Sequence, residues 1–511
     1  MVKVEPGIAK GRARSIDRLV IPLFQDSQSL PSEAWLSSRG LDGSLCRVAQ
    51  RALAEQRFKG EPGEFLLLLG PQRGKVATVV LYGLGREKKL TLDSLRRTIG
   101  ALSRRSRKEG ISEVTLALDT PHLKSRLDLL GWQPSVKAIA TAWIQGGYVF
   151  DAYKPGLNGT GEKRKPTRLV LSSELEPTAM RGGVRVGEVV GIASNFAREL
   201  TNTPANDLYP ERLAELARAM ARSNGLSFSL LRKQDLKRHR MGGLLAVGQG
   251  SDKPPCLMTI QYRARSKAGR RKAPTLALVG KAVTFDCGGI SIKPAKGMEE
   301  MKFDMAGGAA VLGAMQVVSR LQPAVNVVGV IPSAENVIGD SAMRPGDILR
   351  TAAGKTVEIL NTDAEGRLIL ADALDYAQRF KPDYILDFAT LTGACLVALG
   401  TQVSGLVTNH HDFGRKIFEA GERSGERVWE LPLYEEFLEA IKSSVADLKN
   451  STGRNGGTIT AAAFLSCFVG KTPWCHLDIA GTAWAERDTG PFTAGATGVG
   501  VGLVEELLGV L

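Results

Sequence analysis

Side chains that could carry out hydrolytic chemistry gather in two glycine-rich blocks of the 511-residue chain. The first block holds Lys281, Asp286, Lys293 and Asp304, and the second is the octapeptide N-T-D-A-E-G-R-L at Asn361–Leu368. Both blocks follow short aliphatic runs that predict strands. In a largely parallel sheet the ligand site lies at the carboxyl ends of the strands, so we expect the two blocks to share one edge.

The carboxylates of these blocks are too many to lie together without compensation. Asp286, Asp304, Asp363 and Glu365 would repel one another and raise each other's pKa. Two divalent cations remove that repulsion, and cations about 3.5–4 Å apart can share a water and lower its pKa. A neutral lysine nitrogen can also bind a metal. The alternative interpretation is capping, since Asp363 and Glu365 precede a predicted helix. The set as a whole favours a dinuclear metal site.

The elements that must position these residues alternate between strand and helix. In the first part the strands are predicted at Arg18–Phe24, Phe65–Leu69, Ala77–Tyr82, Glu113–Leu118 and Leu169–Ser172, and the helices at Thr91–Lys108 and Ser135–Val149. In the second part the strands are predicted at Leu244–Val247, Met258–Tyr262, Leu276–Val279, Val325–Val330, Tyr384–Phe388 and His476–Ile479. The helices there are predicted at Val184–Leu200, Pro210–Asn224, Gly307–Leu321, Leu368–Phe380 and Gly456–Phe468.

This alternation predicts an α/β protein of two domains, each with a mostly parallel central sheet flanked by helices. The polar stretch 151–168 indicates a loop or linker. We expect a smaller N-terminal α/β domain at residues 1–175 and a connecting helix and linker at 176–206. A larger domain at 207–511 would then hold both blocks.

Charge is distributed unevenly along the chain, whose formal net charge is +14. Residues 1–170 carry 29 basic and 16 acidic side chains, whereas residues 171–511 are close to neutral. The predicted helix Thr91–Lys108 and the loop Arg263–Lys272 each contain six Lys or Arg residues. The asymmetry indicates an anionic partner such as nucleic acid, or a solvated basic surface.

Several classes of protein are excluded by what the sequence lacks. No apolar run approaches the roughly 18 residues of a membrane span, and the first residues lack the apolar stretch of a secretory signal, so we expect a cytoplasmic protein without a membrane partner. The six cysteines form no C-x-x-C pair. A P-loop, a dinucleotide-binding loop, H-E-x-x-H and G-x-S-x-G are also absent.

The two blocks resemble those of the leucyl aminopeptidase, or cytosol aminopeptidase, family. Asn361–Leu368 matches that family's signature in full, and the resemblance extends over roughly residues 195–500, while residues 1–170 resemble the family more loosely. It implies a dinuclear metal-dependent exopeptidase that removes N-terminal residues from peptides, preferably Leu-like ones. It also implies a homohexamer with the first domains at its periphery. Some family members bind DNA as well, which supplies the alternative role for the basic N-terminal domain.

The resemblance further implies a role for each matching position. One metal, Zn or Mn, would be held by Lys281, Asp286, Asp304 and Glu365, and the other by Asp286, Asp363 and Glu365. The bridging hydroxide would attack the scissile carbonyl while Lys293 stabilises the oxyanion, and Arg367 would hold a bicarbonate that acts as general base. The first substrate side chain would lie in a pocket walled by Met301, Thr390, Gly393 and Ala480, with the Leu391 carbonyl near the substrate amine. The metal identities and the detailed residue preference stay open.

Three positions depart from the family's usual residues. Ala282 stands where the family usually has Gly, and strain would follow if that residue needed a positive φ. Gly308 stands where Ala is common. Cys287 replaces the usual Ser beside a metal ligand, where oxidation and inert packing are both open. Every expected metal ligand is present, as are the expected lysine and arginine.

Overall fold

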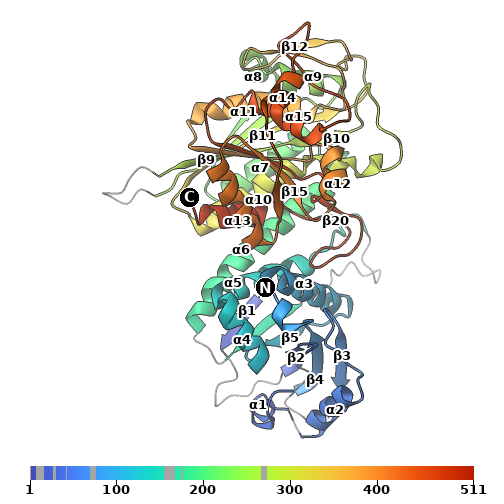
Figure 1. Cartoon of the computed structure of the whole chain (residues 1–511), viewed down its shortest axis with the longest axis vertical. Helices are drawn as coiled ribbons and strands as arrows, with labels where there is room; N and C mark the ends of the chain where they lie inside the picture. Colours follow the sequence, from blue (N-terminus) through green and yellow to red (C-terminus); the bar gives the residue numbers. More distant parts are fainter. Residues whose placement is uncertain are drawn as a thin grey trace. The chain divides into compact units, whose positions relative to one another are not determined.

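The computed structural model describes residues 2–6, 16–26, 30–41, 43–69, 76–154, 167–173, 177–265 and 273–511 (Figure 1). The chain forms two compact units. Unit 1 comprises residues 1–192 and 487–493, and unit 2 comprises residues 193–486 and 494–511. The division falls inside helix α6 (Pro177–Asn202), between the boundaries at 175 and 206 that the sequence predicts.

Unit 1 is built on a six-stranded sheet in the order β1-β6-β5-β2-β4-β3. All neighbours are parallel except β3 and β4. The strands are β1 (Val2–Pro6), β2 (Ile16–Leu23), β3 (Phe65–Leu69), β4 (Val76–Gly83), β5 (Glu113–Ala117) and β6 (Arg168–Ser173). The helices are α1 (Glu33–Ser38), α2 (Gly43–Ala54), α3 (Leu92–Lys108), α4 (Pro121–Leu130), α5 (Trp132–Gly146) and the start of α6, with a 3₁₀ turn at Glu87–Lys89. The predicted α/β layout is confirmed for this unit.

The basic residues of α3 are largely engaged within unit 1. Arg96 is buried, Arg97 pairs with Asp93, and Arg105 pairs with Glu109 and stacks on Phe65. Arg104 donates to backbone carbonyls of the segment 487–493. Arg104 and the stacking of Arg105 on Phe65 attach α3 to its own unit, while the side chains of Arg97 and Arg105 stay about half exposed, and no contact of this helix tests the predicted nucleic-acid role. Within the predicted basic loop only Arg263, Ala264 and Arg265 belong to the described residues.

Unit 2 is built on a nine-stranded sheet in the order β16-β15-β18-β14-β9-β11-β8-β7, with β10 pairing beside β11. Its centre is parallel, and antiparallel pairs join β15 to β18, β11 to β8 and β8 to β7. The strands are β7 (Ser227–Leu231), β8 (Cys256–Tyr262), β9 (Thr275–Gly280), β10 (Ala282–Asp286), β11 (Asn326–Asn336), β14 (Tyr384–Ala389), β15 (Ser404–Thr408), β16 (Val428–Glu430) and β18 (Trp474–Asp478). Short strands lie at Ile348–Arg350 (β12), Thr356–Glu358 (β13), Leu448–Lys449 (β17), Trp484–Ala485 (β19) and Gly495–Ala496 (β20).

Helices cover both faces of this sheet. They are α7 (Pro210–Ser223), α8 (Lys233–Arg238), α9 (Gly242–Val247), α10 (Ala306–Leu321), α11 (Gly366–Ala377), α12 (Gly393–Leu399), α13 (His411–Ser424), α14 (Glu435–Ala440), α15 (Gly457–Ser466) and α16 (Val501–Leu508), with 3₁₀ segments at Gly248–Gly250, Met298–Met305 (η3) and Gln378–Phe380. Alternate residues of the central strands point to opposite faces. Ala277 and Val279 of β9 belong to the same buried apolar cluster as the inner side of α11. Leu276 and Leu278, which point to the other face, are also completely buried, so both faces are apolar, as expected for a covered parallel sheet.

The predicted strand Leu244–Val247 is wrong, because these residues form helix α9. Asp372 of α11 accepts a hydrogen bond from the Leu244 backbone nitrogen at 2.9 Å and another from Ala352 at 2.7 Å. Burial raises the pKa of Asp372 to about 7, although these hydrogen bonds lower it. The start of α9 is thus stabilised by a side chain 128 positions away. A local pattern of four apolar residues contains no sign of that partner.

Positions 282 and 308 pack directly against each other. Ala282 is fully buried in β10 and does not have a positive φ, so the strain considered for this position is absent. A Cβ placed on Gly308 of α10 would lie 2.7 Å from the Cβ of Ala282. The same Cβ would lie 2.9 Å from Ile331 Cγ2, so the contact between β10 and α10 has no free space for a second methyl group beside that of Ala282.

None of the helices in the described residues is long and apolar enough to cross a membrane.

The contact between positions 282 and 308 predicts that the effects of mutating them on stability depend on each other. Gly308→Ala alone overpacks the contact and should lower stability by about 1–3 kcal/mol. Ala282→Gly alone leaves a small gap in a strand and should also destabilise, whereas the double variant should lose less stability than the sum of the two single changes, with the contact to Ile331 remaining. The measurement is the midpoint of thermal unfolding for all four proteins. Simple additivity of the two single shifts would contradict this dependence.

Candidate metal centre

The chemistry-bearing residues of unit 2 meet at the carboxyl ends of its parallel strands. Asp286 is the last residue of β10, Asn336 ends β11, and Asp478 ends β18. Thr390 follows β14 directly, and Glu365 lies at the start of α11. Because these strands are neighbours in a parallel arrangement, their carboxyl ends meet at the same edge, as the sequence predicts.

Lys281 lies at the centre of this edge and is the single residue between β9 and β10. Its Nζ lies 2.8 Å from both Asp304 Oδ2 and Glu365 Oε1, and it donates to the Thr390 carbonyl at 2.9 Å. Burial lowers the pKa of the Lys281 ammonium, but attraction to the carboxylates outweighs burial and the pKa is raised overall. A Cβ on Gly366 would lie 2.7 Å from Lys281 Nζ, so the glycine of the signature octapeptide makes room for the lysine.

Lys293 holds the other pair of acids. Its Nζ lies 2.8 Å from Asp286 Oδ2 and also contacts Asp363 Oδ1. Burial lowers the pKa of the Lys293 ammonium, and the surrounding carboxylates raise it by more. About one fifth of the Lys293 side chain is exposed, whereas Lys281 is almost fully enclosed. The more open lysine can therefore reach a ligand at the surface of the site.

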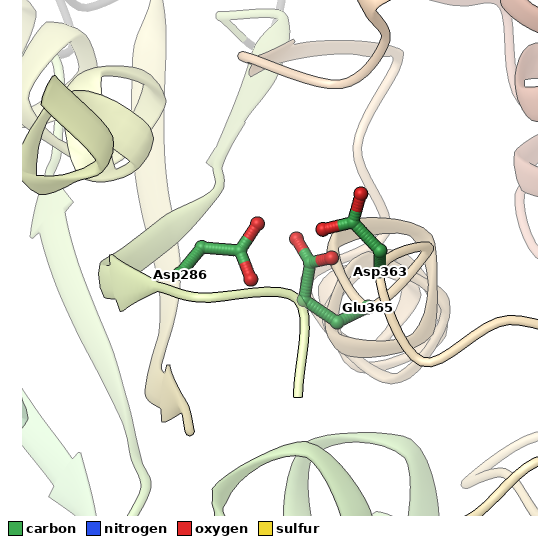
Figure 2. Close-up of side chains that lie close together, drawn as sticks. All are labelled: Asp286, Asp363 and Glu365. Atoms are coloured by element: carbon green, nitrogen blue, oxygen red, sulfur yellow. The ribbon is translucent and has the colours of Figure 1, made fainter. Parts of the chain in front are cut away.

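Three carboxylates point toward one another at this edge (Figure 2). One oxygen from each of Asp286, Asp363 and Glu365 lies within 4.8 Å of the other two. With Asp304 the site has four carboxylates and two lysines. Burial is the main reason that the pKa values of Asp304 and Asp363 are raised. The residual negative charge and the convergent oxygens fit divalent cations, with Lys281 available as a nitrogen ligand once it is neutral.

A buried asparagine that no sequence pattern indicated joins the two ligand loops. Asn336 donates through Nδ2 to Asp286 Oδ1 at 2.8 Å and to the Thr362 carbonyl at 3.1 Å. Thr362 in turn donates to the Gly288 carbonyl at 2.6 Å and accepts from the Ser291 nitrogen at 2.8 Å. The loops after β10 and before α11 are therefore fixed to each other. Such outer hydrogen bonds orient metal ligands.

A second asparagine absent from the sequence predictions, Asn450, holds the signature octapeptide from the other side. It is completely buried, accepts from the Leu360 nitrogen at 2.8 Å and donates to the Asn361 carbonyl at 2.6 Å. Its own backbone carbonyl accepts from Arg367 at 2.8 Å. Burial lowers the pKa of Arg367 to about 10, although attraction to Glu365 and Asp478 raises it. No local motif marks Asn450, because it lies more than 80 residues from its partners.

Hydrogen bonds to Asp478 hold the loop after β14 in place, and the sequence patterns did not single out this residue. Asp478 Oδ1 accepts from the backbone nitrogens of Leu391 at 3.2 Å and Ala480 at 3.1 Å, and its Oδ2 accepts from Thr392 Oγ1 at 2.6 Å. Leu391 and Ala480, predicted to surround the substrate, are thereby held by one carboxylate. Thr390, predicted as a pocket wall, donates to Asp304 Oδ1 at 2.7 Å and so also orients a predicted ligand.

The remaining predicted pocket residues lie on adjoining elements. Met301 is on η3, three residues before Asp304, and is partly buried. Gly393 is the first residue of α12, and a Cβ placed on it would have no atom within 4 Å. Cys287 is a buried free cysteine.

A parallel sheet edge that brings together four carboxylates and two lysines is the kind of site expected of a dinuclear metallohydrolase. Comparison with protein families identifies which one. Residues 195–504 match the model described as the cytosol aminopeptidase family, catalytic domain, and residues 20–156 match that family's N-terminal domain. The chain belongs to the cytosol aminopeptidase family and is a metal-dependent exopeptidase.

Similar proteins span nearly the whole chain. A probable cytosol aminopeptidase of Gloeobacter violaceus is 41% identical over 507 residues, covering 98% of this chain and 97% of that protein. One of Geobacter sulfurreducens is 45% identical over 477 residues, covering 92% and 91%. A tomato leucine aminopeptidase variant superposes with a TM-score of 0.85 at 32% identity, covering 99% and 96%. The bottromycin maturation enzyme BotP in complex with Mn gives 0.81 at 30%, covering 97% and 99%.

The contacts of Asn450 predict a specific loss of metal affinity. Asn450→Ala removes the hydrogen bonds that fix the octapeptide and should weaken Mn²⁺ binding roughly 10- to 100-fold, as loss of outer-shell contacts does. Calorimetric titration of the metal-free protein measures this. Asn409→Ala is the matched control, because the Asn409 side chain also joins two segments of unit 2. It donates to the Thr472 carbonyl and accepts from the Trp474 backbone nitrogen. Equal Mn²⁺ affinity in both variants would contradict the role given to Asn450.

Proposed function

We propose that the protein removes N-terminal residues from peptides in the cytoplasm, with a preference for Leu-like residues. The observation that carries the proposal is the enclosure of Lys281 and Lys293 among four carboxylates at one sheet edge. The similarity to proteins named probable cytosol aminopeptidase supports both the reaction and the location.

Two divalent cations, Zn or Mn, would be held by the residues of this edge. Lys281, Asp286, Asp304 and Glu365 would hold one, and Asp286, Asp363 and Glu365 the other. When bound, such cations activate a water at neutral pH and stabilise negative charge on a carbonyl oxygen. The similar enzyme BotP forms a complex with Mn, which supports Mn as one suitable metal.

Lys293 would stabilise the oxyanion that develops on the scissile carbonyl. In the structure its ammonium pairs with Asp286 and Asp363. Cations bound to those carboxylates would take over this pairing and leave the ammonium free to donate to the substrate. A fixed cation at that position favours the transition state over the ground state.

Arg367 would hold a bicarbonate that acts as the general base. Its Nε is buried, and within the described residues it has no hydrogen-bond partner. Its NH1 is already fixed by the Asn450 carbonyl, so the guanidinium orientation is set. A planar anion that accepts from the open side of the guanidinium would satisfy the unpaired donor.

The first substrate side chain would lie against Met301, Thr390, Gly393 and Ala480, with the substrate amine near the Leu391 carbonyl. Asp478 supports this arrangement because it holds Leu391 and Ala480 in place. An apolar pocket discriminates by only about 1–3 kcal/mol per methylene, so several aliphatic residues should be accepted.

Exposed apolar side chains support self-association, which the resemblance specifies as a homohexamer. Ile290, Ile292 and Leu360 lie on the loops that carry metal ligands, and Ile338 follows Asn336; each is between 45% and 59% exposed. Exposed large apolar side chains of this kind are candidates for an association surface. The number of subunits rests on the resemblance alone.

Glu365→Gln tests the dinuclear assignment. The amide cannot replace the carboxylate that would bind both cations, so release of leucine from leucyl amide should fall roughly 1,000-fold or more, on the order of losing an essential electrostatic group. The chelator EDTA should abolish wild-type activity, and added Mn²⁺ should restore it. Glu299→Gln, an exposed change on η3, should retain activity. Full activity of the Glu365 variant would contradict the proposal.

Gly393→Val tests the pocket. The new side chain meets no protein atom within 4 Å of its Cβ, so the fold should be retained while the pocket narrows. We expect kcat/KM for leucyl amide to fall about 10-fold or more relative to alanyl amide. An unchanged ratio of the two rates would remove Gly393 from the pocket.

A further inference from the structure

A basic groove lies apart from the metal centre, between helix α7 and strand β7 of unit 2. Its volume is about 450 Å³, and Arg218, Arg222 and Arg232 line it together with Phe228 and Leu230. None of these residues belongs to the metal centre or to the proposed pocket. The groove therefore needs an explanation separate from peptide hydrolysis.

The groove carries more positive charge than its own acids neutralise. Arg218 stacks over the Phe228 ring at 5.4 Å. Arg232 lies 3.9 Å from Glu211, and both side chains are at least half exposed. Arg222 is exposed and forms no ion pair within the described residues. Three cations facing one loosely held carboxylate favour an anionic ligand.

The floor of the groove is also the end of a sheet. β7 pairs antiparallel with β8 on one side, and no strand of the described residues pairs with its other side. An outermost strand presents unpaired N–H and C=O groups that can accept another strand. Phe228 and Leu230 are two residues apart and so point to the same face, where both line the groove.

We propose that this groove binds an extended acidic segment of a partner protein. The segment adds as a strand to the outer side of β7, and its carboxylates pair with Arg218, Arg222 and Arg232. Because successive side chains of a strand point to opposite faces, the residues between these carboxylates point away from the face that carries Phe228 and Leu230. Strand pairing gives the orientation, and the arginines select acidic over basic sequences.

The test uses the full chain and a synthetic probe. The probe is an N-acetylated peptide of three Glu-Val repeats with a fluorophore at its carboxyl end. Acetylation removes the free amine that an aminopeptidase requires, so the probe reports binding alone. We expect saturable binding by fluorescence anisotropy, and slower hydrogen exchange of the backbone amides of residues 227–231. A Lys-Val peptide of the same length should not bind.

Variants locate the binding surface. Arg222→Ala combined with Arg232→Ala should weaken binding roughly fivefold or more, because two exposed ion pairs are lost. Arg212→Ala is the matched control, since Arg212 is on the same helix but pairs with Glu215 outside the groove lining. Hydrolysis of leucyl amide should be unchanged in the double variant and in the control, which separates this proposal from the proposed function.

Three results would overturn the proposal. The first is equal binding of the acidic and basic peptides. The second is undiminished binding of a probe with N-methyl groups on alternate residues, which cannot pair as a strand. The third is tighter binding of a single-stranded oligonucleotide that is lost in the double arginine variant, which would assign the groove to nucleic acid.

Discussion

Burial of several carboxylates at one place is unfavourable unless positive charge lies beside each of them. Asp286, Asp304 and Glu365 are each at least 95% buried, and Asp363 lies next to them. Lys281 and Lys293 supply two positive charges, and divalent cations would supply the remainder. The arrangement of the surrounding loops follows from this requirement, because each lysine must reach two carboxylates at hydrogen-bonding distance. The glycine at position 366 leaves the space that Lys281 needs for that reach.

The polar residues around the site keep the charged groups from separating. Asn336 joins the loop after β10 to the loop before α11, Asn450 holds the octapeptide and Arg367, and Asp478 holds the segment after β14. All three are buried. A ligand set that must stay close despite mutual repulsion needs such rigid attachment, since a shift of about 1 Å can cost about 100-fold in rate.

The methyl group of Ala282, in the same strand as the predicted metal ligand Asp286, occupies the space that a side chain at position 308 would need. The arginines of the groove between α7 and β7 differ from the charged residues of the metal centre. They surround no buried charge and fix no ligand, and they add a cationic surface to a unit whose overall charge is near zero.

The sequence alone determined the α/β class, most element positions and the blocks that carry the predicted metal ligands, because these depend on local patterns of apolar, glycine and charged residues. Asp286, Asp363 and Glu365 meet as predicted because the chain order of strands and helices forces them to one edge. Only the tertiary structure decided the partners. Asn450, Asn336, Asp478 and the Asp372 cap of α9 each contact at least one residue between 26 and 128 positions away, and such contacts leave no periodic or local signal. The contact between Ala282 and Gly308 has the same cause, since space between two elements is fixed only when they pack.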